Sequence, residues 1–316
     1  MLWTVAVALG MALLLVAIPI LKAQLVPSER RTLQGVQLCE LEYQEVKFRN
    51  AEQDIKLAGM LFLPEGEGTF PAVVVIHGSG TSRRDNPWYL SFTKYLMDHG
   101  VAVLLPDKRG SEASGGDWRT SSLEDLATDT VAAVHYLRQV HAQKVSAIGV
   151  LGASQGGQIA PIVAARSPEV QFVIDVVGAS VPIGEALLFE ERSNLREFGL
   201  LPGLSDVLAH VTSFYIRTVA QRTFWDAIGN FDPVPFWRQI TVPSLVLYGA
   251  LDTNVPTRAS VDRFAELDRR DIQVVVYEGS GHPLEDPIDR GDRIVRTDAL
   301  EDIVRFIRQA TCPTQL

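Results

Sequence analysis

Three polar residues that lie far apart in the chain have the types and the order that nucleophilic catalysis requires. The first is Ser154, because residues 152–156 read G-A-S-Q-G and match the pattern G-x-S-x-G. An apolar run precedes this segment and a helical pattern follows it, which is the setting of a sharp turn that exposes a serine hydroxyl. Glycines two residues to either side leave room for such a turn. We therefore expect Ser154 to be a nucleophile rather than part of a plain glycine–serine turn.

A serine hydroxyl needs a neighbouring base, and the chain has 6 histidines. His282 follows the last apolar run in a glycine-rich loop, which can lift the imidazole over the edge of a sheet. His77 ends another apolar run. The other histidines lie within helical patterns, where a packed or solvated imidazole is usual: His99, His135, His141 and His210. His282 is thus the predicted base.

A carboxylate usually orients a catalytic imidazole. Asp252 lies shortly after the apolar run at residues 245–248, where a parallel strand would end. The rivals are Asp175, within a strand pattern, and Glu285 and Asp286, beside the candidate histidine. We expect these three to be structural or solvated, and we predict Asp252 as the orienting carboxylate.

Two backbone N–H groups are candidates to stabilise a negatively charged oxygen. Residues 77–80 read H-G-S-G directly after an apolar run, and Gln155 follows the candidate nucleophile at the start of a helical pattern. Donors of this kind stabilise the charge that develops when a nucleophile attacks a carbonyl. We predict an oxyanion hole formed by the backbone N–H groups of Ser79 and Gln155.

These residues need a sheet whose strands end at one edge. Apolar runs without polar alternation indicate strands that are covered on both faces, as in a parallel sheet: residues 72–76, 101–105, 147–151, 172–174, 245–248 and 274–277. Helical patterns alternate with them: residues 88–99, 123–140, 155–166, 258–268 and 294–309. Two alternating segments, 41–48 and 55–63, predict an antiparallel start. The fold class is therefore α/β, with a doubly wound, mostly parallel sheet.

Residues 181–240, approximately, interrupt this alternation with apolar residues at helical spacing. An insertion of this length exceeds an ordinary connection and leaves the sheet where α/β proteins bind ligands. We interpret it as a helical cap, the alternative being helices that pack on the edge of the core. Its large apolar residues are candidates to contact a substrate: Phe189, Phe198, Phe214 and Trp225.

The N-terminal segment, residues 2–21, is uncharged and long enough to span about 30 Å as a helix. No Lys or Arg precedes it and no small-x-small cleavage site follows it, which favours an uncleaved transmembrane anchor over a signal peptide. We therefore expect a membrane-associated protein and leave open which side of the membrane it faces. The alternative is export after cleavage of the segment. Residues 22–38 are predicted to form a linker, followed by one domain at residues 39–316.

Composition excludes several functions. The net charge is −9, and an acidic protein binds a polyanion poorly, so we do not expect nucleic acid as a partner. The 2 cysteines, Cys39 and Cys312, exclude a four-cysteine zinc site or an iron–sulfur cluster. The motifs G-x-x-x-x-G-K-[ST], G-x-G-x-x-G and H-E-x-x-H are absent. We expect neither a cofactor nor a metal.

Taken together, the motifs resemble those of serine hydrolases of the α/β-hydrolase superfamily, in particular a bacterial esterase-like branch. The shared segments are H-G-S-G at 77–80, D-K-R-G at 107–110, S-Q-G-G at 154–157, G-A-L-D at 249–252 and G-H at 281–282. The order Ser154, Asp252, His282 is the order of this superfamily. The resemblance spans about residues 40–310, and it gives the D-K-R-G loop a supporting role without catalysis.

The resemblance implies a carboxylesterase that acts on a small or medium acyl ester through an acyl-enzyme. A thioesterase or an aminopeptidase on the same site is an alternative, as is a catalytically silent binding protein. Silent relatives typically lose the serine or the histidine, whereas this chain keeps both. The oligomeric state stays open.

Overall fold

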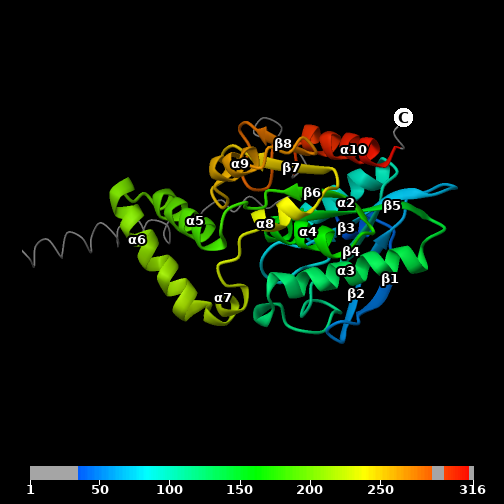
Figure 1. Cartoon of the computed structure of the whole chain (residues 1–316), viewed down its shortest axis with the longest axis horizontal. Coiled ribbons are helices and arrows are strands. Elements are labelled where there is room, and N and C mark those ends of the chain that lie inside the picture. The colour runs from blue at the N-terminus through cyan, green and yellow to red at the C-terminus, as the bar shows by residue number, and fades with distance from the viewer. Residues whose placement is uncertain (1–34, 287–294, 313–316) are drawn as a thin grey trace, which may run out of the picture.

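The computed structural model describes residues 35–286 and 295–312, and these form a twisted sheet with helices on both faces (Figure 1). The strands lie in the order β1-β2-β4-β3-β5-β6-β7-β8. Their bounds are β1 Gln44–Asn50, β2 Ile55–Phe62, β3 Phe70–Ile76, β4 Ala102–Pro106, β5 Val145–Ala153, β6 Val170–Val176, β7 Ser244–Gly249 and β8 Ile272–Tyr277. The pairs β1–β2 and β2–β4 are antiparallel and the others are parallel. The predicted fold class is confirmed.

The first strand shows why an apolar pattern locates a strand better than its ends. Residues 41–48 were expected to be extended, but β1 begins at Gln44. A short 3₁₀-helix, η1 Leu38–Glu40, precedes it, and the Gln37 N–H donates to the Glu40 side chain at 3.3 Å. This local hydrogen bond competes with the extended backbone and shifts the start of the strand.

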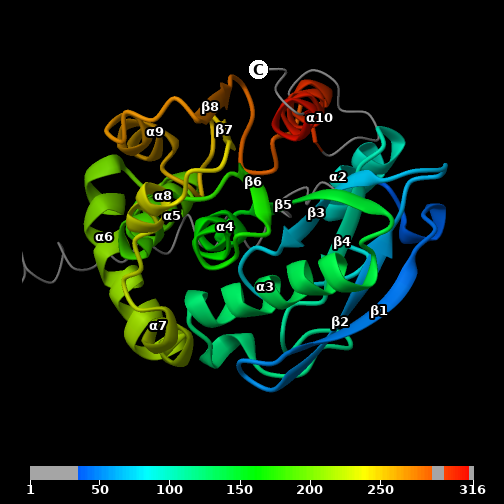
Figure 2. The ribbon, with the colours of Figure 1, turned by 45° about the vertical axis from the view of Figure 1, so that its right-hand side comes forward.

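Helices cover both faces of the sheet (Figure 2). They are α2 Pro87–Asp98, α3 Leu123–Val140, α4 Gln155–Arg166, α9 Thr257–Ala265 and α10 Thr297–Thr311. Side chains of β3 alternate between two apolar clusters: Val74 and Ile76 pack with α3 and α4, whereas Val73 and Val75 pack with α2 and α10. The two buried faces explain the continuous apolar runs of the central strands.

Side-chain hydrogen bonds cap the start of two of these helices, and at α2 the Asn86 side chain accepts the Trp88 N–H at 3.0 Å. Ser122 and Asp125 form a reciprocal capping box at the beginning of α3, with hydrogen bonds of 3.0 and 2.9 Å. Pro161 lies inside α4, where a proline disfavours a helix, yet α4 continues to Arg166. Because α4 is buried from Gln155 to Val163, packing supports it where one main-chain hydrogen bond is missing.

A helical insertion, residues 183–239, separates β6 from β7. It contains α5 Ile183–Glu197, α6 Pro202–Tyr215, the π-helix η3 Ile216–Ala220, α7 Arg222–Ile228 and α8 Val234–Gln239. In Figure 1, α5, α6 and α7 lie to one side of the sheet, and α8 lies next to it. The Trp237 ring of α8 packs at 5.2 Å on Phe264 of α9, which ties the end of the insertion to the core.

The prediction of a membrane-associated protein is not supported and is corrected. Within residues 35–286 and 295–312, no helix has both the length and the apolar character that a membrane crossing needs. The run at residues 2–21, on which the prediction rested, lies outside the described residues. Hydropathy measures the polarity of a segment and does not show which structure the segment forms.

Candidate active site

Ser154 lies at a sharp turn between β5 and α4. Its backbone has φ 55° and ψ −119°, a strained conformation that other contacts must maintain. The Ser154 N–H donates to Val176 O at 2.8 Å. A Cβ on Gly152 would lie 2.1 Å from Gly156 O, and one on Gly156 would lie 2.0 Å from Ile76 O. The glycines of the motif are therefore required by the close approach of the backbone.

The structure brings Ser154, Asp252 and His282 together. His282 Nε2 lies 3.1 Å from Ser154 Oγ, and His282 Nδ1 lies 2.7 Å from Asp252 Oδ2. The Asp252 carboxylate has no exposed surface, and its other oxygen accepts the N–H groups of Asn254 and Val255 at 2.7 and 2.9 Å. A carboxylate beside Nδ1 favours the tautomer with the proton on Nδ1, which leaves Nε2 free to accept the serine proton.

The rival carboxylates have other surroundings. Asp175 is buried near the end of β6, where its Oδ1 accepts the Gly178 N–H at 2.8 Å. Burial raises the pKa of Asp175 to about 7. Glu285 accepts the Gly281 N–H at 3.1 Å and so supports the turn before His282. Among the described hydrogen bonds of these carboxylates, the one to the His282 imidazole is made by Asp252.

The loop after β3 lies against the serine turn. A Cβ on Gly78 would lie 3.3 Å from both Ala153 O and Ser154 Cβ, so the loop and the serine turn are closely packed here. The Gly78 N–H donates to the Tyr89 hydroxyl at 2.7 Å, and His77 Nε2 lies 2.7 Å from Pro106 O. Burial lowers the pKa of His77 to about 4, which keeps the imidazole neutral. His77 therefore holds the loop in place.

Residues 73–297 match the model of the alpha/beta hydrolase family, which is most of the chain. The chain belongs to this family. It is 25% identical over 249 residues to Esterase EstD of Thermotoga maritima, covering 73% of this chain and 59% of the esterase. It is 24% identical to the acylamino-acid-releasing enzyme of Homo sapiens, over 74% of this chain and 32% of that enzyme. The chain therefore spans less than two thirds of either curated relative.

Solved structures share the fold of this α/β hydrolase. The Pyrococcus furiosus esterase Pf2001 superposes with a TM-score of 0.63 at 18% identity, over 85% of this chain and 92% of that chain. Est1E from Butyrivibrio proteoclasticus, in complex with ferulic acid, superposes with a TM-score of 0.55 at 20% identity, over 84% and 96% of the chains. At these identities the likeness establishes the fold.

A pocket of about 310 Å³ adjoins Ser154. Ser79 and Gln155, the predicted oxyanion donors, line it beside the serine. The helical insertion supplies an apolar wall: Ile183, Ala186, Leu187, Ile216, Phe224, Trp225 and Ile228. Glu190 also lines it, and its carboxylate accepts Asn254 Nδ2 at 3.2 Å. Burial raises the pKa of Glu190.

The aromatic residues expected to contact substrate divide into two groups. Trp225 lines the pocket and is 7% exposed. Phe198 and Phe214 are 48% and 68% exposed on the outer surface of the insertion, and Phe189 is not among the residues that line the described pocket. The expectation that some of these residues contact substrate stays a prediction and now rests on Trp225, because helical spacing identifies an apolar face without showing whether that face points inward.

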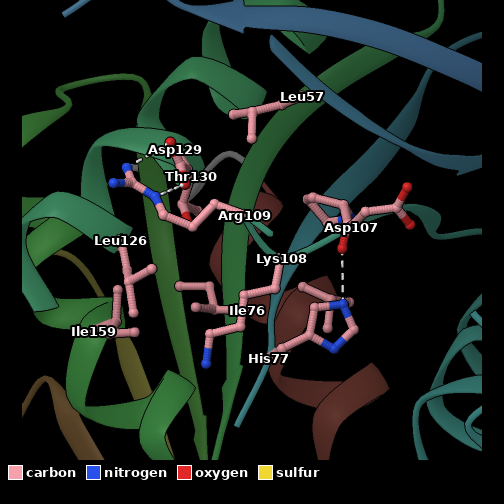
Figure 3. A pocket seen from close by; sticks show the side chains of 12 residues that line it. Leu57, Ile76, His77, Asp107, Lys108, Arg109, Leu126, Asp129, Thr130 and Ile159 are labelled. Atoms are coloured by element: carbon pink, nitrogen blue, oxygen red, sulfur yellow. Dashed lines mark hydrogen bonds and ion pairs between the residues drawn. The ribbon is translucent and has the colours of Figure 1, made fainter. Parts of the chain in front are cut away.

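Two residues near the site were missed or undervalued. Trp88 Nε1 donates to Pro283 O at 3.1 Å, and its ring centroid lies 6.1 Å from that of His282, a contact for which the sequence holds no local signal. Lys108 is buried in the D-K-R-G loop, and burial lowers its pKa to about 7. Its signal in the sequence was a charged residue two positions after the end of the apolar strand β4. Figure 3 shows Lys108 between His77 and Arg109.

In the part of the chain that the structure describes, no group of three or more His, Cys, Asp or Glu side chains is arranged to hold a metal ion. The expectation of a metal-free and cofactor-free protein stays a prediction.

Proposed function

We propose that this α/β hydrolase cleaves carboxylic esters through an acyl-enzyme on Ser154. The observation that carries the proposal is the chain of hydrogen bonds from Asp252 through His282 to Ser154 Oγ, with distances of 2.7 and 3.1 Å. The pattern is that of a nucleophile, its base and the group that orients the base. The names of the esterase relatives agree with this chemistry.

In the acylation step, Ser154 Oγ attacks the ester carbonyl carbon while His282 Nε2 accepts the hydroxyl proton. The carbonyl π electrons move to the oxygen, which accepts hydrogen bonds from the N–H groups of Ser79 and Gln155. The tetrahedral intermediate then collapses, and His282 gives its proton to the departing alkoxide. An alcohol leaves, and the acyl group stays on Ser154.

In the deacylation step, a water molecule takes the place of the alcohol. His282 accepts a proton from the water as its oxygen attacks the acyl carbon, and the same oxyanion donors stabilise the second tetrahedral intermediate. Collapse returns the proton to Ser154 Oγ and releases a carboxylic acid. Asp252 stays ionised throughout and stabilises the imidazolium.

The proposed substrate is an ester with a small or medium acyl group. The pocket volume of about 310 Å³ is at the lower end of small-molecule sites. Apolar side chains from α5 and α7 would surround the acyl chain, since Leu187 and Trp225 line the same pocket as Ser154.

The test combines covalent labelling with substrate hydrolysis. Wild-type protein should react with a fluorophosphonate probe at Ser154 and hydrolyse p-nitrophenyl esters, whereas Ser154→Ala should do neither. Ser146→Ala is the matched control, because Ser146 is exposed near the other end of β5 and should leave both reactions unchanged. A panel of acyl-thioesters and acetyl-amino-acid p-nitroanilides tests the alternatives. Faster turnover of either class than of every ester would overturn the ester assignment, and an unlabelled wild-type protein would overturn the mechanism.

A further inference from the structure

The Lys108 amine lies close to the proposed oxyanion hole without touching Ser154, Asp252 or His282 in the contacts described. The residue is 8% exposed, and its Nζ donates to Gly78 O at 2.8 Å and to Gln155 Oε1 at 2.9 Å. Its amine therefore joins the loop after β3 to the first residue of α4. These are the two segments that carry the predicted oxyanion donors.

The neighbouring carboxylates are engaged by arginines. Asp107 pairs with Arg84 at 2.9 Å, and Asp129 pairs with Arg109 at 2.6 Å. The described hydrogen bonds of Lys108 Nζ go to neutral oxygens instead, and the Trp118 ring lies 5.2 Å away. Burying an amine against two amide oxygens costs desolvation energy, so a lysine at this position calls for an explanation beyond charge pairing.

One of these oxygens belongs to the peptide group that carries the predicted oxyanion donor of Ser79. Gly78 O and the Ser79 N–H are parts of the same planar amide, so a donor that fixes the carbonyl also fixes the direction of the N–H. A hydrogen bond to the carbonyl oxygen also polarises the amide and strengthens its N–H as a donor. On the other side, the bond to Oε1 restrains Gln155, whose backbone N–H is the second predicted donor.

We propose that Lys108 is a positioning residue that fixes and polarises the Gly78–Ser79 peptide for oxyanion binding. The inference rests on the proposed function, because it assumes a tetrahedral oxyanion at Ser154. It gives the lysine of the D-K-R-G loop a part in the reaction that the supporting role expected from the sequence does not include. A cavity of about 40 Å³ beside Lys108 leaves space for substitutions there (Figure 3).

The test compares transition-state and ground-state binding in Lys108→Met and Lys108→Gln. An alkyl trifluoromethyl ketone is the probe: Ser154 Oγ bonds to its carbonyl carbon, the π electrons move to the oxygen, and His282 takes the proton. We expect kcat to fall about 10- to 100-fold in Lys108→Met with KM within about threefold, because loss of a whole oxyanion donor costs about 10²–10³. The inhibition constant of the ketone should rise in parallel with the fall in kcat, whereas that of the carboxylic acid product should not. Lys108→Gln, which keeps an N–H donor, should lie between Lys108→Met and wild type.

Arg84→Gln is the matched control, because it removes the ion pair of the adjacent Asp107 and contacts neither Gly78 nor Gln155. This variant should have a lower Tm, while its kcat and the inhibition constant of the trifluoromethyl ketone should be unchanged. Wild-type kcat and ketone binding in Lys108→Met would overturn the inference, as would failure of both Lys108 variants to fold, since the lysine would then serve stability alone. Failure of the proposed function is seen separately, as absence of ester hydrolysis and labelling in the wild-type protein.

Discussion

Asp252 has two structural tasks, and each uses a different carboxylate oxygen. Oδ2 faces His282, while Oδ1 accepts the N–H groups of Asn254 and Val255. An asparagine would keep Oδ1 as the acceptor for the backbone. Its NH₂ group would then face the imidazole and impose the tautomer with the proton on Nε2, which cannot accept a proton from Ser154.

The first prediction at the residue scale is therefore that Asp252→Asn folds with near wild-type Tm and loses most of its activity. The loss of kcat for a p-nitrophenyl ester should be about 10⁴, the order measured for the equivalent change in chymotrypsin-type enzymes. Glu285→Gln keeps an acceptor for the Gly281 N–H and should lose less than about threefold. Asp286→Asn is assayed beside them. If Asp252→Asn stayed active and either of the other two collapsed, the orienting carboxylate would have been misassigned.

The sequence predicted the candidate triad because each member is marked by local chemistry. Ser154 is flanked by glycines that the turn requires, His282 follows a glycine, and Asp252 lies three residues after the end of β7. Lys108 could not be interpreted in this way, because its partners Gly78 and Gln155 lie 30 and 47 positions away. A buried lysine is recognised only when the fold shows what its amine contacts.

At the scale of elements, the helical insertion shows the limit of periodicity. In α6, Ser205, Ala209 and Ser213 are buried, whereas Val207, Val211 and Phe214 are exposed. The apolar spacing correctly indicated helices, but in α6 three small residues are buried while three large apolar residues are exposed. The core strands were predicted more accurately, since residues covered on both faces leave no polar alternation to mislead.

This arrangement predicts opposite outcomes for two aromatic residues of the insertion. Trp225→Ala should enlarge the pocket and shift the preferred p-nitrophenyl ester toward longer acyl chains, because the ring lines the pocket. Phe214→Ala should leave the acyl-length profile within about twofold of wild type, since its side chain is exposed. The profile is measured as kcat/KM across acyl lengths from two to twelve carbons, roughly. An unchanged profile in Trp225→Ala would show that the insertion does not select the acyl group.

At the scale of the whole molecule, two buried ionisable groups make stability depend on pH with opposite signs. His77 has its pKa lowered to about 4, so the unfolded state gains a proton first and stability is lost as pH falls from about 6.5 to about 4. Asp175 has its pKa raised to about 7, so the unfolded state loses its proton first. Stability from Asp175 is complete below about pH 4 and is lost as pH rises to about 7.

We expect Asp175→Asn to remove the second dependence, because the amide resembles the protonated acid. The free energy of unfolding of the variant minus that of the wild type should increase by about 4 kcal/mol between pH 4 and pH 7 and then stay level. Urea unfolding of both proteins across this range gives the difference, in which the effect of His77 cancels. A difference independent of pH would mean that Asp175 is already ionised at pH 4 in the folded protein.

The separation of the site residues along the chain has a consequence for biosynthesis. Ser154 and His282 are 128 positions apart, and the helical insertion lies between them. Domains acquire structure from the N-terminal side as they are synthesised, and contacts between distant segments form late. When β5 and the serine turn have left the ribosome, the histidine has yet to be translated. Under the proposed mechanism, the nascent chain therefore carries a serine without its base, and it is inert toward esters until the last strand and its loop have emerged.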